Sequence, residues 1–244
     1  MADVGLSGRV ALVTGALGGI GRALALRLAE AGCDVAVAYR SGDPDELLAA
    51  LAATGRRAVA VQGDLADPDV PARLLGETQD ALGPVDVLVA NAGLGTRAVL
   101  ADIDADLWQR TLAVNLTAPF LLCQGAVPAM AERGWGRVLL VSSVAAFTGG
   151  VVGPHYATTK AGLLGLTHSL AATYAGRGVT VNALAPALVA GTAMLPGDEG
   201  ELAAMLPVGR LGTPGEVADL ALAMLRNGYL TSQAIGLDGG MHPR

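Results

Sequence analysis

The chain has only two cysteines, Cys33 and Cys123, among its 244 residues. Neither belongs to a CxxC pair or stands at zinc-ligand spacing from a histidine, so the sequence predicts neither a metal site nor a redox dithiol. Both lie in apolar surroundings. We interpret them as small buried hydrophobic residues of a protein in a reducing compartment.

Aromatic residues make up only 3% of the sequence, and the formal net charge is −6. Nucleic-acid binding requires a basic surface, and single strands also require aromatic stacking platforms, so we expect no nucleic-acid partner. Residues 1–9 lack an apolar signal region, and we expect no membrane-spanning run and no membrane partner. These features favour a cytoplasmic protein.

Hydrophobic residues, mainly Ala, Leu and Val, make up 52% of the chain. Short apolar runs predict strands at residues 10–14, 34–39, 58–63, 85–91, 137–142, 180–184 and 234–237. Longer amphipathic stretches predict helices at residues 19–31, 44–54, 67–82, 107–132, 157–176 and 214–225. Strands that are apolar on both faces and alternate with helices indicate a covered parallel sheet. We therefore predict one α/β domain, a Rossmann-type doubly wound parallel sheet of about seven strands with helices on both faces.

The least regular stretch is residues 186–207, which contains Gly191, Pro196 and Gly197. It follows a predicted strand and therefore lies at the carboxyl edge of the sheet, where open α/β folds bind ligands. It is a candidate substrate lid, and a plain surface connection is the alternative.

A glycine-rich turn joins the first predicted strand to the first helix. Its glycines stand at positions 15, 18, 19 and 21. Glycines let the backbone bend tightly and approach a pyrophosphate, and the following helix offers free N–H groups and the positive end of its dipole. The turn therefore predicts a dinucleotide site, with a tight turn that binds no ligand as the alternative.

Further motifs follow along the chain. They are Asp64, Asn91-Ala92-Gly93, Asn115, Ser143, Tyr156, Lys160, Asn182, Pro186 and Asp238-Gly239-Gly240. With the TGxxxGxG spacing of the glycines, they make the chain resemble the short-chain dehydrogenase/reductase family over essentially its whole length, most closely its β-ketoacyl-[acyl-carrier-protein] reductase branch. The resemblance implies one NAD(P)-binding domain over residues 1–244. It implies cofactor contacts at Gly15, Gly18, Gly19, Ile20, Gly21, Tyr39, Arg40, Ser41, Asp64, Leu65, Asn91, Ala92, Gly93, Tyr156, Lys160, Pro186, Val189 and Thr192.

The residues that end the second predicted strand indicate which cofactor is preferred. An acidic residue there would bind the ribose hydroxyls of NAD, but the chain has Tyr39, Arg40 and Ser41. Arg40 can bind a 2′-phosphate, so we expect NADP(H) to be preferred, with NAD(H) not excluded. An ordinary exposed charge is the alternative for Arg40. For Asp64, which resembles the family's adenine-contacting residue, the alternative is a turn or N-cap aspartate.

Four residues form a candidate catalytic group. Tyr156 and Lys160 are four residues apart at the start of a predicted helix and share one face, and Lys160 is the chain's only lysine. A nearby ammonium lowers the pKa of a tyrosine, which can then exchange a proton with the substrate oxygen. By the resemblance, Lys160 also binds the nicotinamide ribose and Ser143 hydrogen-bonds the substrate carbonyl. Asn115 holds a water linked to Lys160, or else satisfies neighbouring backbone groups.

The region after the sixth predicted strand departs from the family pattern. The usual Pro-Gly is Pro186-Ala187, and Thr192 comes one position late. Ala187 requires ordinary backbone angles where glycine would not. The contacts of Val189 and Thr192 with the cofactor are therefore an open question. His155, beside Tyr156, is interpreted as a residue at the pocket rim.

The resemblance implies a 3-oxoacyl thioester as substrate and an acyl carrier protein as a candidate partner, for which Arg133 and Arg177 fall near docking positions. Two solvated helix-end arginines are the alternative. Related branches act on sugars, polyols, steroids and polyketides, and a non-catalytic NADP-binding sensor is a more distant alternative. Helices 107–132 and 157–176 match those that build a homotetramer in relatives.

Overall fold

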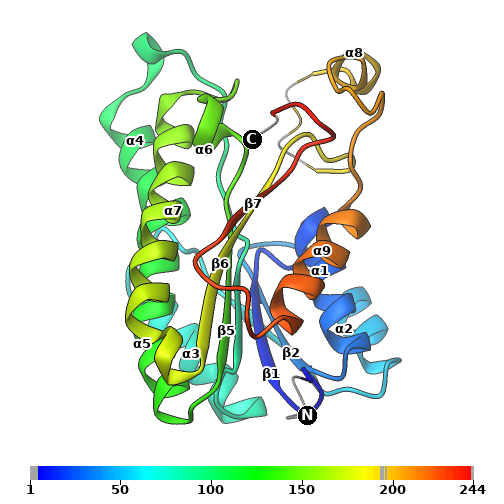
Figure 1. Cartoon of the computed structure of the whole chain (residues 1–244), viewed down its shortest axis with the longest axis vertical. Coiled ribbons are helices and arrows are strands. Elements are labelled where there is room, and N and C mark those ends of the chain that lie inside the picture. Colours follow the sequence, from blue (N-terminus) through cyan, green and yellow to red (C-terminus); the bar gives the residue numbers. More distant parts are fainter. Residues whose placement is uncertain (1–4, 193–194, 196, 243–244) are drawn as a thin grey trace.

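The structure, a computed structural model, describes residues 5–192, 195 and 197–242 (Figure 1). Within these residues seven strands form one parallel sheet in the order β3-β2-β1-β4-β5-β6-β7. The predicted doubly wound sheet is therefore confirmed. The strands are β1 (Val10–Thr14), β2 (Asp34–Tyr39), β3 (Ala58–Gln62), β4 (Val87–Ala90), β5 (Gly136–Val141), β6 (Val179–Pro186) and β7 (Ala234–Leu237).

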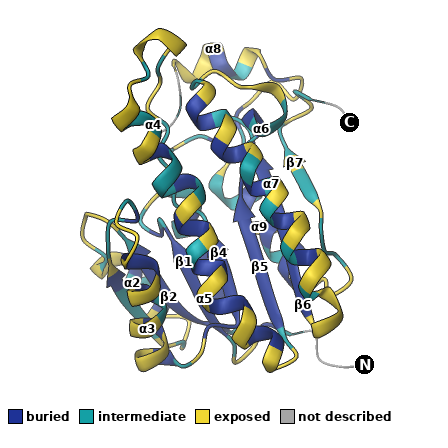
Figure 2. Cartoon of the chain, turned by 90° about the vertical axis from the view of Figure 1, so that its left-hand side faces the viewer, coloured by how far each residue is buried: buried dark blue, intermediate teal, exposed yellow. Residues whose placement is uncertain are grey.

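Helices cover both faces of the sheet (Figure 1). One face carries α1 (Gly19–Glu30), α2 (Asp45–Ala52) and α9 (Pro214–Arg226), and the other carries α3 (Val70–Leu82), α5 (Ala118–Glu132) and α7 (Pro154–Tyr174). Successive strand residues point to opposite faces, so Leu12 packs in the core beneath α3, α5 and α7 while Val13 packs beneath α1 and α9. The inner strands are buried, the edge strands β3 and β7 are partly exposed, and the helices expose their outer faces (Figure 2).

The predicted helix at 107–132 is broken in the structure. It consists of α4 (Ala105–Leu112), a π-helical turn (Ala113–Thr117) and α5. Pro119 lacks the N–H that an α-helix would direct at the carbonyl of Asn115, and the N–H of Ala118 instead bonds to the carbonyl of Ala113. The ladder therefore shifts to i→i+5 at this point, a change often found at functional sites.

Mean hydropathy and length would allow the run Ala105–Glu132 to cross a membrane, because it has 28 residues and a window of mean hydropathy 1.4. The expectation that no run reaches this length is therefore corrected. In this fold the run is a packed helix of the domain, because α5 contacts α3, β4 and β5.

Residues 186–207 contain a helix that the sequence did not predict, α8 (Glu199–Ala204). Asp198 caps it by accepting hydrogen bonds from the N–H groups of Gly200 and Glu201, at 2.9 and 3.2 Å. A small apolar cluster then holds the segment together, with Leu202, Leu206 and Leu211 at its centre. Residues 193, 194 and 196 of this candidate lid lie outside the described residues.

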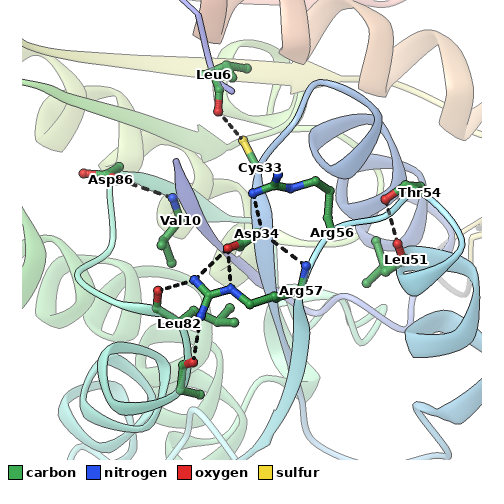
Figure 3. Close-up of polar contacts among 11 residues, drawn as sticks. Leu6, Val10, Cys33, Asp34, Leu51, Thr54, Arg56, Arg57, Leu82 and Asp86 are labelled. Atoms are coloured by element: carbon green, nitrogen blue, oxygen red, sulfur yellow. Dashed lines mark hydrogen bonds and ion pairs between the residues drawn. The ribbon is translucent and has the colours of Figure 1, made fainter. Parts of the chain in front are cut away.

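Ion pairs fasten the amino edge of the sheet (Figure 3). The carboxylate of Asp34, at the start of β2, accepts hydrogen bonds from Arg56 Nη2 at 2.6 Å and from Arg57 Nε at 2.8 Å and the Arg57 backbone N–H at 3.1 Å. Burial alone would raise the pKa of Asp34, but these hydrogen bonds and the two positive charges lower it. The cluster ties the start of β2 to the start of β3, far from the carboxyl edge.

Three short elements complete the fold. A 3-10 turn (Leu100–Asp102) precedes α4, the short α6 (Ala145–Thr148) follows β5, and a second 3-10 turn (Ala175–Arg177) follows α7. The two cysteines are buried, as predicted, and burial raises the pKa of both thiols to about 12.

Candidate active site

The topological switch point of the sheet lies between β1 and β4: the chain runs outward from β1 through β2 to β3 on one side, and from β4 to β7 on the other. Loops after β1 and β4 diverge there and leave a crevice at the carboxyl edge, the usual ligand site of such sheets. Thr14 and Asn91 hold the two strand ends together. Thr14 Oγ1 accepts from the N–H groups of Asn91 and Ala92, both at 3.0 Å, and Asn91 Nδ2 donates to the Thr14 carbonyl at 2.9 Å.

The glycine turn needs its glycines. Gly15 has a φ of +64°, and a Cβ there would lie 2.9 Å from the Cα of Ala92. A Cβ on Gly21 would collide with the carbonyl oxygen of Gly15. The turn is thus packed at backbone distance against the β4 end, and the first turn of α1 begins at Gly19 beside it. This arrangement suits a pyrophosphate bound at a helix N-terminus.

A cavity of about 320 Å³ runs along this crevice. It gathers most of the predicted cofactor residues, and those that line it are Gly15, Gly18, Gly19, Ile20, Gly21, Tyr39, Arg40, Ser41, Asp64, Leu65, Asn91, Ala92, Gly93 and Thr192. The glycine cradle, the helix N-terminus and the cavity fit a dinucleotide. Seven further lining residues were not among the predicted cofactor contacts: Thr14, Leu17, Ala38, Gly63, Leu74, Leu94 and Val114.

Asp64 has more than one role in the structure. Its Oδ1 accepts from the N–H of Ala66 at 3.0 Å, as expected of a turn aspartate, and its Oδ2 lies 3.0 Å from Arg110 Nη2. The hydrogen bond from Ala66 and the pairing with Arg110 lower the pKa of Asp64. The turn interpretation is therefore confirmed, while the adenine contact stays a prediction. Arg110 was missed because it stands 46 residues away from Asp64.

The three predicted catalytic side chains meet where β5 ends and α7 begins. Ser143 and Tyr156 share a side-chain hydrogen bond. Lys160 is 2% exposed, and its Nζ donates to the carbonyl of Val141 at 2.8 Å and lies 5.6 Å from the centre of the Tyr156 ring. Ser142 Oγ donates to the Lys160 carbonyl at 2.8 Å, which joins the strand end to the helix.

Burial governs the ionisation of these groups. It raises the pKa of Tyr156, and the hydrogen bond with Ser143 offsets only part of that rise. It lowers the pKa of Lys160 to about 8. The expected lowering of the Tyr156 pKa by the ammonium is not met in this arrangement, because Nζ is directed at a backbone carbonyl and burial dominates.

Asn115 lies in the π-helical turn and is fully buried. Its Oδ1 accepts from the N–H of Leu94 at 2.7 Å, and its Nδ2 donates to the Leu94 carbonyl at 2.8 Å and to Thr159 Oγ1 at 3.2 Å. The interpretation as a residue that satisfies backbone groups is confirmed. Its predicted link to Lys160 through a water stays a prediction.

Ala187, directly after β6, has an ordinary backbone angle. Ala187 is not among the described residues with positive φ, whose only non-glycine member is Ser232 at 61°. Alanine at this position therefore causes no backbone strain. Thr192 lines the cavity and its Oγ1 donates to the Val189 carbonyl at 2.8 Å, whereas Val189 is buried and lies outside the cavity lining.

Among the described residues there is no group of three or more His, Cys, Asp or Glu side chains able to hold a metal ion.

Comparison with known proteins decides the family. Residues 9–201 match the family model described as short chain dehydrogenase. The chain belongs to the short-chain dehydrogenase family. It is thus an NAD(P)-dependent oxidoreductase of the short-chain dehydrogenase/reductase type.

Relatives within the short-chain dehydrogenase family span several substrates. The chain is 37% identical over 98% of its length to 3-oxoacyl-[acyl-carrier-protein] reductase FabG of Aquifex aeolicus (strain VF5), of which it covers 99%. It is 36% identical over 97% of its length to L-rhamnose 1-dehydrogenase (NAD(P)(+)) of Sphingomonas sp. (strain SKA58), of which it covers 97%. A blue fluorescent protein from a metagenomic library, solved in complex with NADPH, has a TM-score of 0.90 and 37% identity, with 98% and 99% of the two chains covered.

The two arginines considered for carrier-protein docking lie away from the catalytic group. Arg133 donates to the Val85 carbonyl at 2.7 Å and lies 3.2 Å from Asp86, so it is committed to the amino edge of the sheet. Arg177 follows the far end of α7 and stacks on Tyr174, with its guanidinium carbon 5.7 Å from the ring centre. The 21 residues of α7 correspond to about 30 Å of helix between Arg177 and the catalytic end.

Proposed function

We propose that this enzyme uses NADPH to reduce a ketone to a secondary alcohol, and that its substrate is a 3-oxoacyl thioester. One observation carries the proposal: Tyr156 and Lys160 meet Ser143 at the end of β5, the strand beside β4, and the residues that follow β4 line the cavity that fits a dinucleotide. The relationship to the 3-oxoacyl-[acyl-carrier-protein] reductase of Aquifex aeolicus supports this substrate class.

When bound, NADPH would supply a hydride for the carbonyl carbon of the ketone. Tyr156 donates its hydroxyl proton to the carbonyl oxygen as negative charge develops there, so that the ketone gains one hydride and one proton. Ser143 donates a hydrogen bond to the same oxygen and orients it. With the cofactor bound, Lys160 would exchange its bond to Val141 for the nicotinamide ribose, and its charge would stabilise the Tyr156 phenolate that remains once the proton has left.

The end of β2 supports a preference for NADPH over NADH. Arg40 and Ser41 line the cavity there, and Tyr39 occupies the position at which a carboxylate would repel a 2′-phosphate. The similarity to a protein solved with NADPH points the same way.

A sugar or another secondary alcohol is the second candidate substrate. The L-rhamnose 1-dehydrogenase of Sphingomonas is almost as similar to this chain as the thioester reductase is. The catalytic group serves either reaction, because the same proton transfer run backwards oxidises an alcohol.

We also propose a cytoplasmic homotetramer assembled through the outer faces of α5 and α7, with an acyl carrier protein as a candidate partner. These faces are exposed in the single chain (Figure 2). Antiparallel pairing of α7 between two copies would bring Arg177 of one copy towards the catalytic end of the other, whereas within one copy the two are about 30 Å apart. Residues 186–207 would act as the substrate lid.

The test is consumption of NADPH and NADH by the purified protein with an acetoacetyl thioester, beside a panel of ketones, sugars and secondary alcohols. Rapid thioester reduction with NADPH is the expected result. Turnover restricted to sugars or other alcohols would keep the chemistry and reject the thioester. NADPH binding without turnover of any compound would favour the non-catalytic sensor.

A further inference from the structure

The loop after β4, residues 94–100, is fastened to the catalytic helix. We call it the β4 loop. The Asn115 side chain hydrogen-bonds both backbone groups of the loop's first residue, Leu94. The N–H of Leu94 donates to Asn115 Oδ1 at 2.7 Å, and Asn115 Nδ2 donates to the Leu94 carbonyl at 2.8 Å. Asn115 in turn donates to Thr159 Oγ1 of α7 at 3.2 Å. The β4 loop therefore begins in a fixed position relative to α7.

Two more contacts fix the middle of the β4 loop. His155 Nε2 lies 2.9 Å from the carbonyl oxygen of Thr96, and the N–H of Ala98 donates to the carbonyl of Val152 at 2.9 Å. His155 belongs to the first turn of α7 and directly precedes Tyr156. The histidine ring thus joins the β4 loop to the residue next to the proton donor.

The histidine is buried and uses only one of its two ring nitrogens. Its exposed fraction is 1%, and Nδ1 has no hydrogen-bond partner among the described residues. A carbonyl oxygen only accepts, so Nε2 carries the proton and donates it to Thr96. The sequence predicted a residue at the pocket rim, and the structure shows a buried histidine that makes one directed bond to a loop.

Gly153 shows how closely the parts are packed. It has a φ of +139°, and a Cβ there would collide with the carbonyl oxygen of Ala98 and lie 2.9 Å from His155 Nδ1. The β4 loop, Gly153 and the histidine ring are therefore in contact without spare volume. Only glycine allows this approach.

The outer surface of this assembly is apolar and open to solvent. Val99 and Leu100 are 66% and 76% exposed, and Val151, beside the Ala98–Val152 contact, is 54% exposed. Leu94, at the other end of the β4 loop, lines the cavity. The loop thus runs from the cavity to an apolar rim and passes the first turn of the catalytic helix.

We propose that His155 is a positioning residue that holds the β4 loop as a wall of the substrate pocket through its single Nε2–H bond to Thr96. It does not touch the reacting atoms, and its effect is on the affinity for the ketone. The inference rests on the proposed function, because the wall affects turnover only if the substrate binds beside Tyr156.

The three variants His155→Gln, His155→Asn and His155→Ala test this role. The amide nitrogen of glutamine can reach the place of Nε2, whereas that of asparagine reaches only the place of Nδ1, which has no partner. We expect the Asn and Ala variants to raise KM for the ketone about tenfold, the loss expected for one buried hydrogen bond, with kcat and the NADPH Kd changed less than about twofold. The Gln variant should keep KM within about threefold of the wild type. His168→Gln, the same change at an exposed position of α7, is the matched control.

Hydrogen exchange of the amides at 94–100 gives a second measurement that needs no turnover. These amides should exchange faster in the Asn and Ala variants and at the wild-type rate in the Gln variant. If the wild type turns over no ketone, the proposed function fails while this measurement still tests the anchor. Equal KM values and equal exchange rates for the Asn and Gln variants would overturn the proposal. Loss of folding in the Gln variant would also overturn it. Either result would mean that a hydrogen-bond donor at the place of Nε2 is not what holds the β4 loop.

Discussion

Inside the protein, Lys160 Nζ donates a hydrogen bond to the carbonyl oxygen of Val141 at 2.8 Å. Val141 precedes the catalytic candidate Ser143 by two residues. This is the chain's only lysine, and it is 2% exposed. Burying an ammonium with one neutral partner is costly. The lowered pKa of Lys160, about 8, expresses that cost. The place of Lys160 in the predicted catalytic group explains why the chain contains a buried lysine that destabilises the fold.

Replacement of this lysine should therefore stabilise the protein while inactivating it. The pKa of Lys160 in the folded protein lies below the unfolded value of 10.5. The unfolded chain therefore binds more protons between about pH 8 and 10.5, and below about pH 8 the buried charge destabilises the folded protein in full. The lowered pKa of Lys160 corresponds to a destabilisation of about 3 kcal/mol. Loss of the hydrogen bond to Val141 in the variant should cancel about 1 kcal/mol of the gain. Urea unfolding without cofactor should show Lys160→Met to be about 2 kcal/mol more stable at pH 7. The gain should shrink towards pH 10, and a less stable variant at pH 7 would contradict this account.

Tyr156→Phe should remove the proton donor and keep the ring. General acid catalysis contributes roughly a hundred- to ten-thousand-fold, so we expect kcat/KM to fall on that scale. The Kd for NADPH, measured by fluorescence titration, should change less than about twofold, because the phenyl ring preserves the packing of this buried residue. Tyr174→Phe near the other end of α7 is the matched control. Turnover retained in Tyr156→Phe would reject the proposed mechanism.

The sequence predicted the sheet well because the strands are short apolar runs, and all but the edge strands β3 and β7 are buried on both faces. The bounds of β1, β2 and β7 match the predicted ranges, while β4 covers only Val87–Ala90 of the predicted residues 85–91. The break at Asn115 was not predicted, although Pro119 carried its signal. Helix α8 was missed because its six residues are too few to show periodicity.

The candidate site was predicted where motif positions coincide with strand ends. Contacts between distant segments could not be predicted in the same way. The pairing of Asp64 with Arg110 and the bond between His155 and Thr96 join residues 46 and 59 positions apart, and each depends on how a loop packs. The direction of Lys160 towards Val141 likewise depends on side-chain geometry that residue spacing does not contain.

Arg40→Ala should change the choice of cofactor. The guanidinium is exposed at the end of the cavity and can bind a 2′-phosphate with charge-assisted hydrogen bonds. We expect KM for NADPH to rise about ten- to a hundredfold and KM for NADH to stay within about twofold. Arg226→Ala, which removes an exposed arginine outside the cavity lining, should change neither value. An equal rise for both cofactors would mean that Arg40 does not distinguish them.

Asp34→Asn should destabilise the protein without changing the catalytic site. The carboxylate lies between Arg56 and Arg57 at the amino edge of the sheet (Figure 3), and its side chain is 8% exposed. An amide keeps the shape of the carboxylate but removes its charge, which leaves the two arginine cations side by side. Because both arginines reach solvent, we expect the free energy of unfolding at pH 7 to fall by about 2 kcal/mol, less than for a fully buried pair.

The pH dependence of that loss gives a sharper test. The hydrogen bonds hold the folded pKa of Asp34 below its usual value of 3.8, so the carboxylate contributes its stability above about pH 4 and loses it as the pH falls through the folded pKa. The stability difference between wild type and Asp34→Asn, measured by urea unfolding, should therefore shrink as the pH is lowered from 7 to below 4. Asp80→Asn, a change at an exposed aspartate of α3 on the same scaffold, should show little difference at any pH. A constant difference for Asp34→Asn across that range would mean that its charge contributes nothing to the stability of this edge.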